Sequence, residues 1–199
     1  MRKKFLYFIV LIPCFLTALK SDNLPALFVQ RLARAQIIFI RPENYVDTPL
    51  VKNGQMHYEY ALKYPGKNFE VRYAVMPLDS VFIQFEAMQK DQKSVGTVLN
   101  PNKLYEGSFY AVMMNISNRG RQPKIQAFPA DAAKKEFNAD WAGFGLCEAG
   151  GEFASGYKYC MAVAIHKDNL GDAYYFYLSN DAADFQTLLP PIFYAMKFK

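Results

Sequence analysis

The chain has 199 residues, of which 52% are hydrophobic and 16% aromatic, so it can bury a sizeable core and is not intrinsically disordered. Its formal net charge is +5, but residues 1–18 hold three basic and no acidic residues, and the remaining balance is 20 − 18 = +2. This small excess leaves no basic patch of the kind that binds nucleic acid, and the length favours one domain.

The first eighteen residues have the pattern of a secretory signal peptide. Residues 2–4 are basic, residues 5–16 are apolar, and Ala18 is a small residue suited to a cleavage site. We predict a signal peptide over 1–18, a single α+β domain over 19–199, and a periplasmic or secreted location. The alternative is an uncleaved anchor, although the apolar run is short for a span of about 20 residues. No later segment is long enough to span a membrane.

Residues 57–64 and 69–75 predict a β-hairpin. Each run alternates between aromatic or aliphatic side chains and charged or small ones, and Pro65 and Gly66 fit the central positions of a type II turn. We expect one face of this hairpin to be buried and the other to be exposed to solvent. The charged residues of the face expected to be exposed are Glu59, Lys63, Glu70 and Arg72.

Hydrophobic spacing and helix-breaking residues predict the other elements. Helices are expected over residues 22–35, 80–90, 104–116, 131–138 and 181–189. Short strands are expected over residues 36–41, 124–128 and 141–146. Residues 192–199 fit both a strand and a short helix.

A second hairpin is predicted over residues 157–166 and 173–179, on either side of a polar turn that contains Gly171. Bulky residues on both faces of the second run favour a central strand, covered by helices on one side and half covered on the other. Tyrosine-rich surfaces bind partners well. The candidate partner surface is therefore Tyr174, Tyr175 and Tyr177, and the competing interpretation places these tyrosines in the core.

Cys147 and Cys160 are the cysteines that remain after the signal peptide. An even number in an exported chain suggests one disulfide, and the glycines between the two cysteines allow this segment to fold back on itself. We predict a Cys147–Cys160 disulfide across adjacent strands. The alternative is a pair of reduced, buried thiols. Two cysteines are too few for a structural zinc site.

The chain has two histidines. His57 lies close to Glu59 in the sequence, and His166 lies close to Asp168. A histidine beside a carboxylate is compatible with acid–base catalysis, but we interpret both as surface residues at strand ends. Because no nucleophile motif and no phosphate-binding loop is present, no catalytic residue, cofactor or metal is predicted.

The order of elements resembles the family of PsbP, the extrinsic protein of the oxygen-evolving photosystem. The resemblance involves residues 130–137 as a capped helix before a strand, the hairpin of residues 157–166 and 173–178, and residues 181–198 as a closing helix and tail. It implies an antiparallel sheet with helices on its faces and a non-catalytic accessory or binding role. No ligand residue carries over, and the two cysteines and the loop over 90–103 depart from the family.

We therefore predict an α+β protein with a mainly antiparallel sheet of about five to seven strands and helices packed on its faces. The expected function is that of an exported, non-enzymatic accessory or binding protein of the cell envelope. Its partner would be an envelope protein or a small ligand. One alternative is a small exported hydrolase or other enzyme that uses His57 or His166 with a nearby carboxylate. A further alternative is a structural envelope protein without a ligand.

Overall fold

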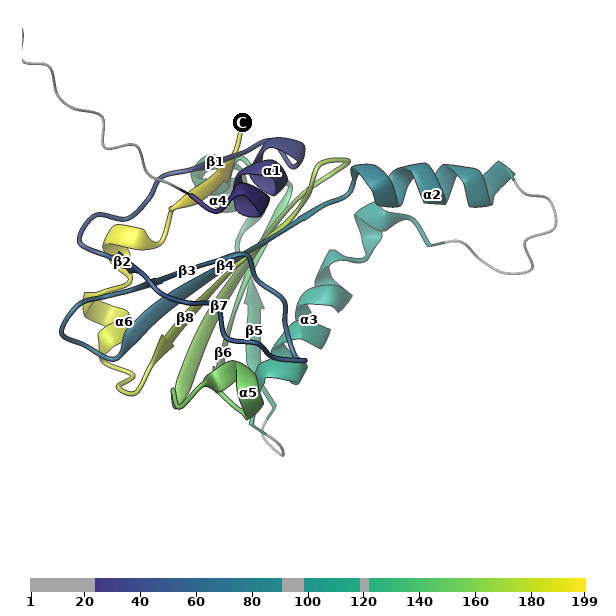
Figure 1. Cartoon of the computed structure of the whole chain (residues 1–199). Coiled ribbons are helices and arrows are strands. Elements are labelled where there is room, and N and C mark those ends of the chain that lie inside the picture. Colours follow the sequence, from purple (N-terminus) through teal and green to yellow (C-terminus); the bar gives the residue numbers. More distant parts are fainter. Residues whose placement is uncertain (1–23, 91–98, 119–121) are drawn as a thin grey trace, which may run out of the picture.

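The computed structural model describes residues 24–90, 99–118 and 122–199, and this part of the chain contains six α-helices and two antiparallel sheets (Figure 1). The predicted signal peptide lies outside the described residues. The larger sheet has seven strands in the order β2-β3-β4-β8-β7-β6-β5, which confirms the α+β class and the predicted sheet size. These strands are β2 (Val46–Asp47), β3 (Tyr60–Lys63), β4 (Phe69–Pro77), β5 (Lys124–Ala127), β6 (Trp141–Glu148), β7 (Tyr159–Lys167) and β8 (Gly171–Ser179).

Both predicted hairpins are present. The turn between β3 and β4 contains Gly66 at φ 82°, which confirms the positive φ that a type II turn requires. The turn between β7 and β8 contains Asn169 at φ 64°, in the left-handed region that asparagine tolerates. The two hairpins join along β4 and β8, which pair from Phe69↔Ser179 to Pro77↔Gly171. The middle of the sheet therefore consists of β4, β8 and β7.

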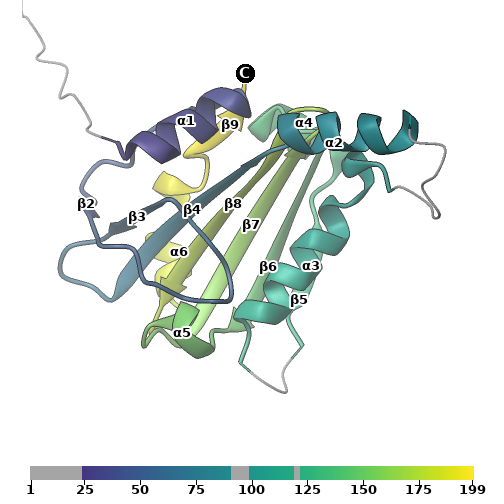
Figure 2. The same cartoon turned by 45° about the vertical axis from the view of Figure 1, so that its right-hand side comes forward.

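Helices cover both faces of this sheet. Figure 2 shows α3 in front of the sheet and α6 behind it. One face packs against α1 (Ala26–Arg34), α4 (Ala130–Phe137), α6 (Asp184–Thr187), the 3₁₀ helix η2 (Pro190–Ile192), and a small sheet of β1 (Ile37–Phe39) and β9 (Met196–Phe198). The other face packs against α3 (Tyr105–Ile116) and α5 (Gly151–Ala154). The sequence of residues 192–199 fitted both a strand and a short helix. These residues contain a strand, because β9 pairs with β1.

The tyrosines predicted as a partner surface lie in the core instead. Tyr174 is 1% exposed, and Tyr175 and Tyr177 are fully buried. Their strand, β8, lies between β4 and β7, and helices cover both of its faces. The prediction of a tyrosine surface is thus wrong, and the competing interpretation is confirmed.

The first hairpin also lacks the solvent-exposed face predicted from its charged residues. Glu59 is 3% exposed, Glu70 is 6% exposed, and Arg72 is fully buried. Because β4 pairs with β8, the part of the hairpin that carries Arg72 continues into the second core cluster, where Tyr58 and Phe153 cover the guanidinium. Glu59 is paired instead with Arg31 of α1. The charges must therefore find partners inside the protein.

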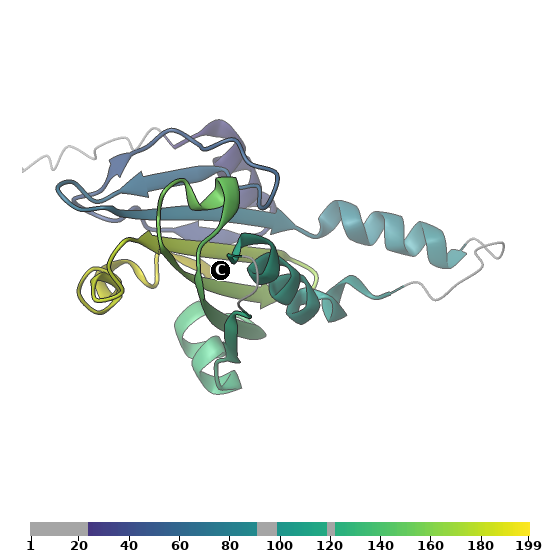
Figure 3. The same cartoon turned by 90° about the horizontal axis from the view of Figure 1, so that it is seen from below.

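One helix extends beyond the body of the fold. α2 (Asp79–Lys90) follows β4 and points away from the sheet, and the chain returns through the 3₁₀ helix η1 (Pro101–Lys103) and α3 (Figures 1 and 3). Of the twelve residues of α2, which the structure describes in full, none is buried. We call the described residues 79–90 and 99–116 the α2–α3 arm. None of the helices in the described residues is long and apolar enough to cross a membrane.

Candidate functional site

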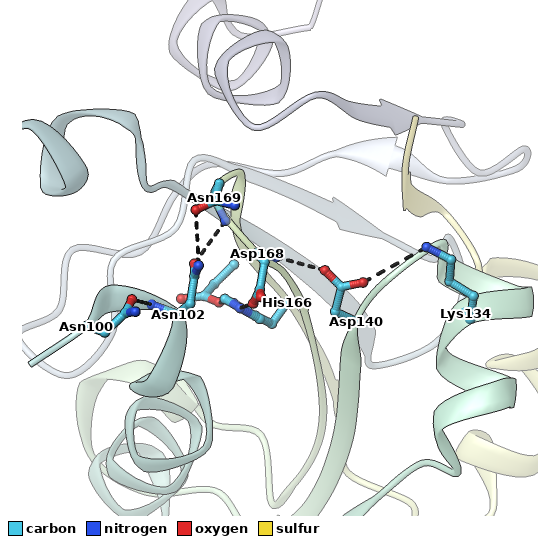
Figure 4. A network of polar contacts seen from close by, with 8 residues as sticks. Asn100, Asn102, Lys134, Asp140, His166, Asp168 and Asn169 are labelled. Carbon is cyan, nitrogen blue, oxygen red and sulfur yellow. Dashed lines mark hydrogen bonds and ion pairs between the residues drawn. The ribbon is translucent and has the colours of Figure 1, made fainter.

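His166, near the end of β7, lies inside a polar network (Figure 4). Its Nδ1 is 2.7 Å from Oδ1 of Asp172, and its Nε2 is 3.0 Å from Oδ1 of Asp168. The ring of Tyr105 stacks on the imidazole, with the two ring centroids 4.3 Å apart. His166 is only 1% exposed, because α3 brings Tyr105 over the end of its strand. The interpretation of His166 as a surface residue is therefore wrong.

The network continues into segments that are distant in the sequence. The side-chain oxygen of Asn102 in η1 accepts from the backbone N–H of Asn169, and the Asn102 amide donates to Oδ1 of Asn169. On the other side, Oδ2 of Asp140 accepts from the backbone N–H of Asp168, and Lys134 lies 4.0 Å from Asp140. These contacts hold η1, the β7–β8 turn and the α4–β6 connection together (Figure 4).

The two carboxylates set the protonation state of His166. Burial lowers the pKa of the imidazole, but the hydrogen bonds and charges of Asp172 and Asp168 outweigh burial, so that the pKa is raised above its ordinary value. An imidazolium donates from both nitrogens, which matches an acceptor at each one. A general base needs an unprotonated nitrogen that faces its substrate. The cluster therefore has the geometry of a buried ion pair that joins structural elements.

This cluster predicts a pH dependence of stability. A folded-state pKa above the unfolded value of about 6.5 means that the contribution of His166 is fully present below about pH 6.5 and is lost as pH rises through the folded pKa. The groups that face the ring are the carboxyl groups of Asp168 and Asp172 and the ring of Tyr105. We expect the difference in unfolding free energy between wild type and His166→Gln to shrink as pH rises. Urea denaturation between about pH 5 and 9 measures this difference.

The matched control for this experiment is His57→Gln, because the His57 side chain is 72% exposed and lies at another place in the fold. We expect its effect on the unfolding free energy to stay small throughout the range. A His166→Gln effect that stayed constant or grew with increasing pH would contradict the assignment of a stabilising imidazolium.

His57 is exposed as predicted, and its nearby carboxylate is already engaged. Nε2 of His57 is 3.8 Å from Oε1 of Glu59, whereas Arg31 lies 3.0 Å from the same oxygen and the Val75 backbone N–H donates to Oε2. Burial raises the pKa of Glu59, against the hydrogen bond from Val75 and the charge of Arg31. Within the described residues, no three His, Cys, Asp or Glu side chains are grouped so that they could hold a metal ion.

Cys147 and Cys160 face each other across β6 and β7, where they are paired in the register. Both are buried free thiols in the structure. Cys147 is 8% exposed and Cys160 is fully buried. The predicted juxtaposition is thus confirmed, while the disulfide stays a prediction.

The fully buried Arg72 forms a second polar cluster. Its Nε is 2.5 Å from Oε1 of Glu70, and its Nη1 donates to the backbone carbonyl of Phe153. Its Cζ lies 5.0 Å from the ring centroid of Tyr58 and 4.9 Å from that of Phe153. The hydroxyl of Tyr157 donates to Oε2 of Glu70 at 3.2 Å. Among the described residues, Nη2 of Arg72 has no hydrogen-bond partner.

Sequence reasoning missed this cluster because alternation indicates which residues share a face but not what covers that face. Its one local signal was the pair of opposite charges at Glu70 and Arg72, two residues apart on one strand. The partners Phe153 and Tyr157 come from a segment about eighty residues later, which no local pattern connects to β4.

A surface hollow lies elsewhere in the fold. Two adjoining cavities of about 830 and 660 Å³ lie beside residues 41–45 and Tyr64. Arg41 reaches across this corner to the hydroxyl of Tyr60 at 3.1 Å and to Asp47 at 3.2 Å. Neither cavity is lined by a residue that the sequence predicted as a site.

The α2–α3 arm is the main exposed apolar feature of the described residues. It carries seven of their fifteen exposed large hydrophobic side chains, and Ile83 is 71% exposed. The seven are Val81, Ile83, Met88, Leu99, Leu104, Tyr110 and Met114. Larger exposed apolar patches are typical of interaction sites.

Three comparisons with known proteins gave one similar solved structure to report. By its fold, the chain is an α+β protein with helices on both faces of its main sheet. No protein-family model matches the chain, and no curated protein matches it. Among solved structures, the chain is similar to cyanobacterial PsbP (CyanoP) from Synechocystis sp. PCC 6803, with 13% identity and a TM-score of 0.43, over 83% of this chain and 88% of that one. The cyanobacterial structure belongs to the family whose resemblance was noted in the sequence.

Proposed function

We propose that the chain is an exported, non-enzymatic accessory protein that binds another protein through the α2–α3 arm. The observation that carries this proposal is α2 itself, a helix of twelve residues without a buried side chain. Helices of this length are marginal in water, and most helices in proteins are stabilised by packing of an apolar face. A partner that covers α2 would supply that packing.

The side chains of α2 indicate how a partner would bind. Val81, Phe82, Phe85 and Met88 fall on one side of the helix at helical spacing. Phe82 and Phe85 are half-buried and contact each other edge to face, with their centroids 6.2 Å apart. An apolar stripe at this spacing is what a hydrophobic groove of another protein recognises.

The charges of the arm favour a protein partner over a phosphate-rich one. Its described residues contain the basic side chains Lys90 and Lys103 and the acidic side chains Asp79, Glu86 and Glu106. Of these, Asp79 is paired with Arg34 of α1. Nucleic acids and anionic lipid surfaces recruit clusters of Lys and Arg, and the arm has none. An apolar groove on a different protein is thus the occupant we propose.

A site-specific crosslink tests this proposal. We place the photoreactive residue p-benzoylphenylalanine at position 81 of the full chain, since Val81 lies on the apolar stripe of α2 and is 40% exposed. The protein is expressed in the organism that encodes it, and the cells are irradiated. We expect one discrete crosslinked species that contains a different protein. The same probe at position 50 is the matched control, since Leu50 is also exposed, at 53%, and lies outside the arm.

A second variant links the crosslink to the surface. Adding Met88→Lys places a charge on the same stripe of α2, where Met88 is 51% exposed. We expect this change to weaken crosslinking from position 81 severalfold, while circular dichroism stays unchanged. Equal crosslinking from positions 81 and 50, or the absence of any crosslink from position 81, would overturn the proposal. A product of twice the mass of the chain would identify a second copy as the occupant and would overturn the proposed hetero-partner.

Export is a separate part of the proposal, and it is supported by the signal-peptide pattern of residues 1–18. We expect the protein from the envelope or the medium to begin after Ala18, which amino-terminal sequencing measures. An intact amino terminus on a protein confined to the cytosol would overturn export while leaving the arm proposal standing.

A further inference from the structure

The two cysteines differ in their position within the same pair. Cys147 lies next to the last residue of β6, where the chain leaves the sheet, and Cys160 is the second residue of β7. Cys160 is fully enclosed in the core cluster that contains Phe153, Phe176 and Leu178. Cys147 keeps a small exposed area at the rim of this cluster. Of the two cysteines, only Cys147 therefore has any area open to a reagent from solution.

The chemistry of the two thiols has the same asymmetry. The hydrogen bond from Cys160 lowers the pKa of the Cys147 thiol, against the effect of burial. Burial raises the pKa of the Cys160 thiol, and the hydrogen bond to Cys147 adds to this increase. The thiolate is the nucleophilic form of cysteine, so that the cysteine with the larger exposed area is also the more readily ionised one.

We infer that Cys147 and Cys160 form a redox-active dithiol, in which Cys147 attacks an external disulfide and Cys160 resolves the intermediate. The cross-strand pairing of the two residues and the one-sided access to Cys147 carry this inference. The oxidant is a low-molecular-weight disulfide such as oxidised glutathione.

The reaction is a pair of thiol–disulfide exchanges. The Cys147 thiolate attacks one sulfur of the external disulfide, the external S–S bond breaks, and one glutathione leaves as a thiolate that takes up a proton. Cys160 then loses its proton and attacks the sulfur of Cys147, which releases the second glutathione. Two protein thiols are oxidised to one disulfide, and one external disulfide is reduced to two thiols.

The disulfide would form beside the end of α3. Ser117 pairs with Ala149 in an isolated bridge, Asn118 N–H donates to the carbonyl of Glu148, and Gly150 N–H donates to the carbonyl of Ile116. Oxidation would join β6 to β7 just before this contact. The redox state is therefore expected to change the stability of the place where the α2–α3 arm returns to the sheet.

The experiment uses the full chain in a Cys14→Ser background, which leaves only Cys147 and Cys160. The reduced, folded protein is incubated with oxidised glutathione and analysed by mass spectrometry. We expect the parent protein to lose two hydrogens and to carry no glutathione. Cys160→Ser is expected to retain one glutathione on Cys147, whereas Cys147→Ser is expected to react at least tenfold more slowly until denaturant is added.

A measurement without cysteine variants guards against misfolding. Brief alkylation of the reduced, folded protein followed by peptide mapping is expected to label Cys147 before Cys160. Faster glutathionylation of Cys147→Ser than of Cys160→Ser, or earlier alkylation of Cys160, would overturn the assigned roles. Two thiols that persist in oxidised glutathione, or a disulfide that reduced glutathione cannot open in the folded protein, would overturn the redox-active pair.

Discussion

Replacing Arg72 by Met is expected to lower the free energy of unfolding by about 3–5 kcal/mol, which is the usual cost of removing one partner of a buried ion pair. Arg72 is fully buried, and its loss leaves the carboxylate of Glu70 inside the protein with Tyr157 as its remaining side-chain partner. Glu70→Met is expected to be similarly costly, because the guanidinium would remain buried without a counter-charge. Urea or guanidinium denaturation measures both effects.

The double variant Arg72→Met/Glu70→Met is expected to be more stable than either single variant, because apolar residues of similar volume often replace a buried pair without loss. A double-mutant cycle isolates the coupling between the two side chains. Arg34→Met is the matched control, because the pair of Arg34 with Asp79 is exposed to solvent. The denaturation midpoint of this variant should hardly differ from that of the wild type. An Arg72→Met effect no larger than that of Arg34→Met would contradict the buried cluster.

Replacing Tyr175 by Ala is expected to cost about 3–5 kcal/mol of unfolding free energy, as aromatic-to-alanine changes in a core do. The Tyr175 ring is fully buried in the central strand β8 and lies 6.0 Å from the ring of Tyr73 and 6.5 Å from that of Phe137. Its hydroxyl donates to the backbone carbonyl of Met196, which ties β8 to β9. The measurement is the midpoint and slope of denaturant unfolding.

The matched control is Tyr110→Ala on α3, where the side chain is 50% exposed and the expected change in unfolding free energy is within about 0.5 kcal/mol.

Removing only the tyrosine hydroxyl separates the contribution of packing from that of hydrogen bonding. Tyr175→Phe should cost about 1–3 kcal/mol, because the carbonyl of Met196 loses its donor. Tyr73→Phe should be neutral or stabilising, because the buried Tyr73 hydroxyl has no hydrogen-bond partner among the described residues. Equal effects of Tyr175→Ala and Tyr110→Ala would contradict the position of β8.

The polar clusters show where local patterns stop being informative. Asp168 is two residues from His166 and was visible in the sequence, whereas Tyr105 and Asn102 come from about sixty residues earlier in the chain. Asp172 was hidden for another reason, since its place opposite His166 depends on the register of the β7–β8 hairpin. A histidine at a strand end is exposed unless another element covers it, and α3 does so here.

The sequence by itself determined the local elements of this protein. Alternation with period two set the strands, Gly66 supplied the positive φ of its turn, and the facing positions of Cys147 and Cys160 followed from one short fold-back. Only the tertiary structure decided that β4 lies against β8. That single pairing makes β8 a central strand, which buries Tyr175 and Tyr177, and it encloses Glu70 and Arg72. The physical reason is that the period of a strand indicates which side chains point the same way, whereas burial depends on what packs against that side.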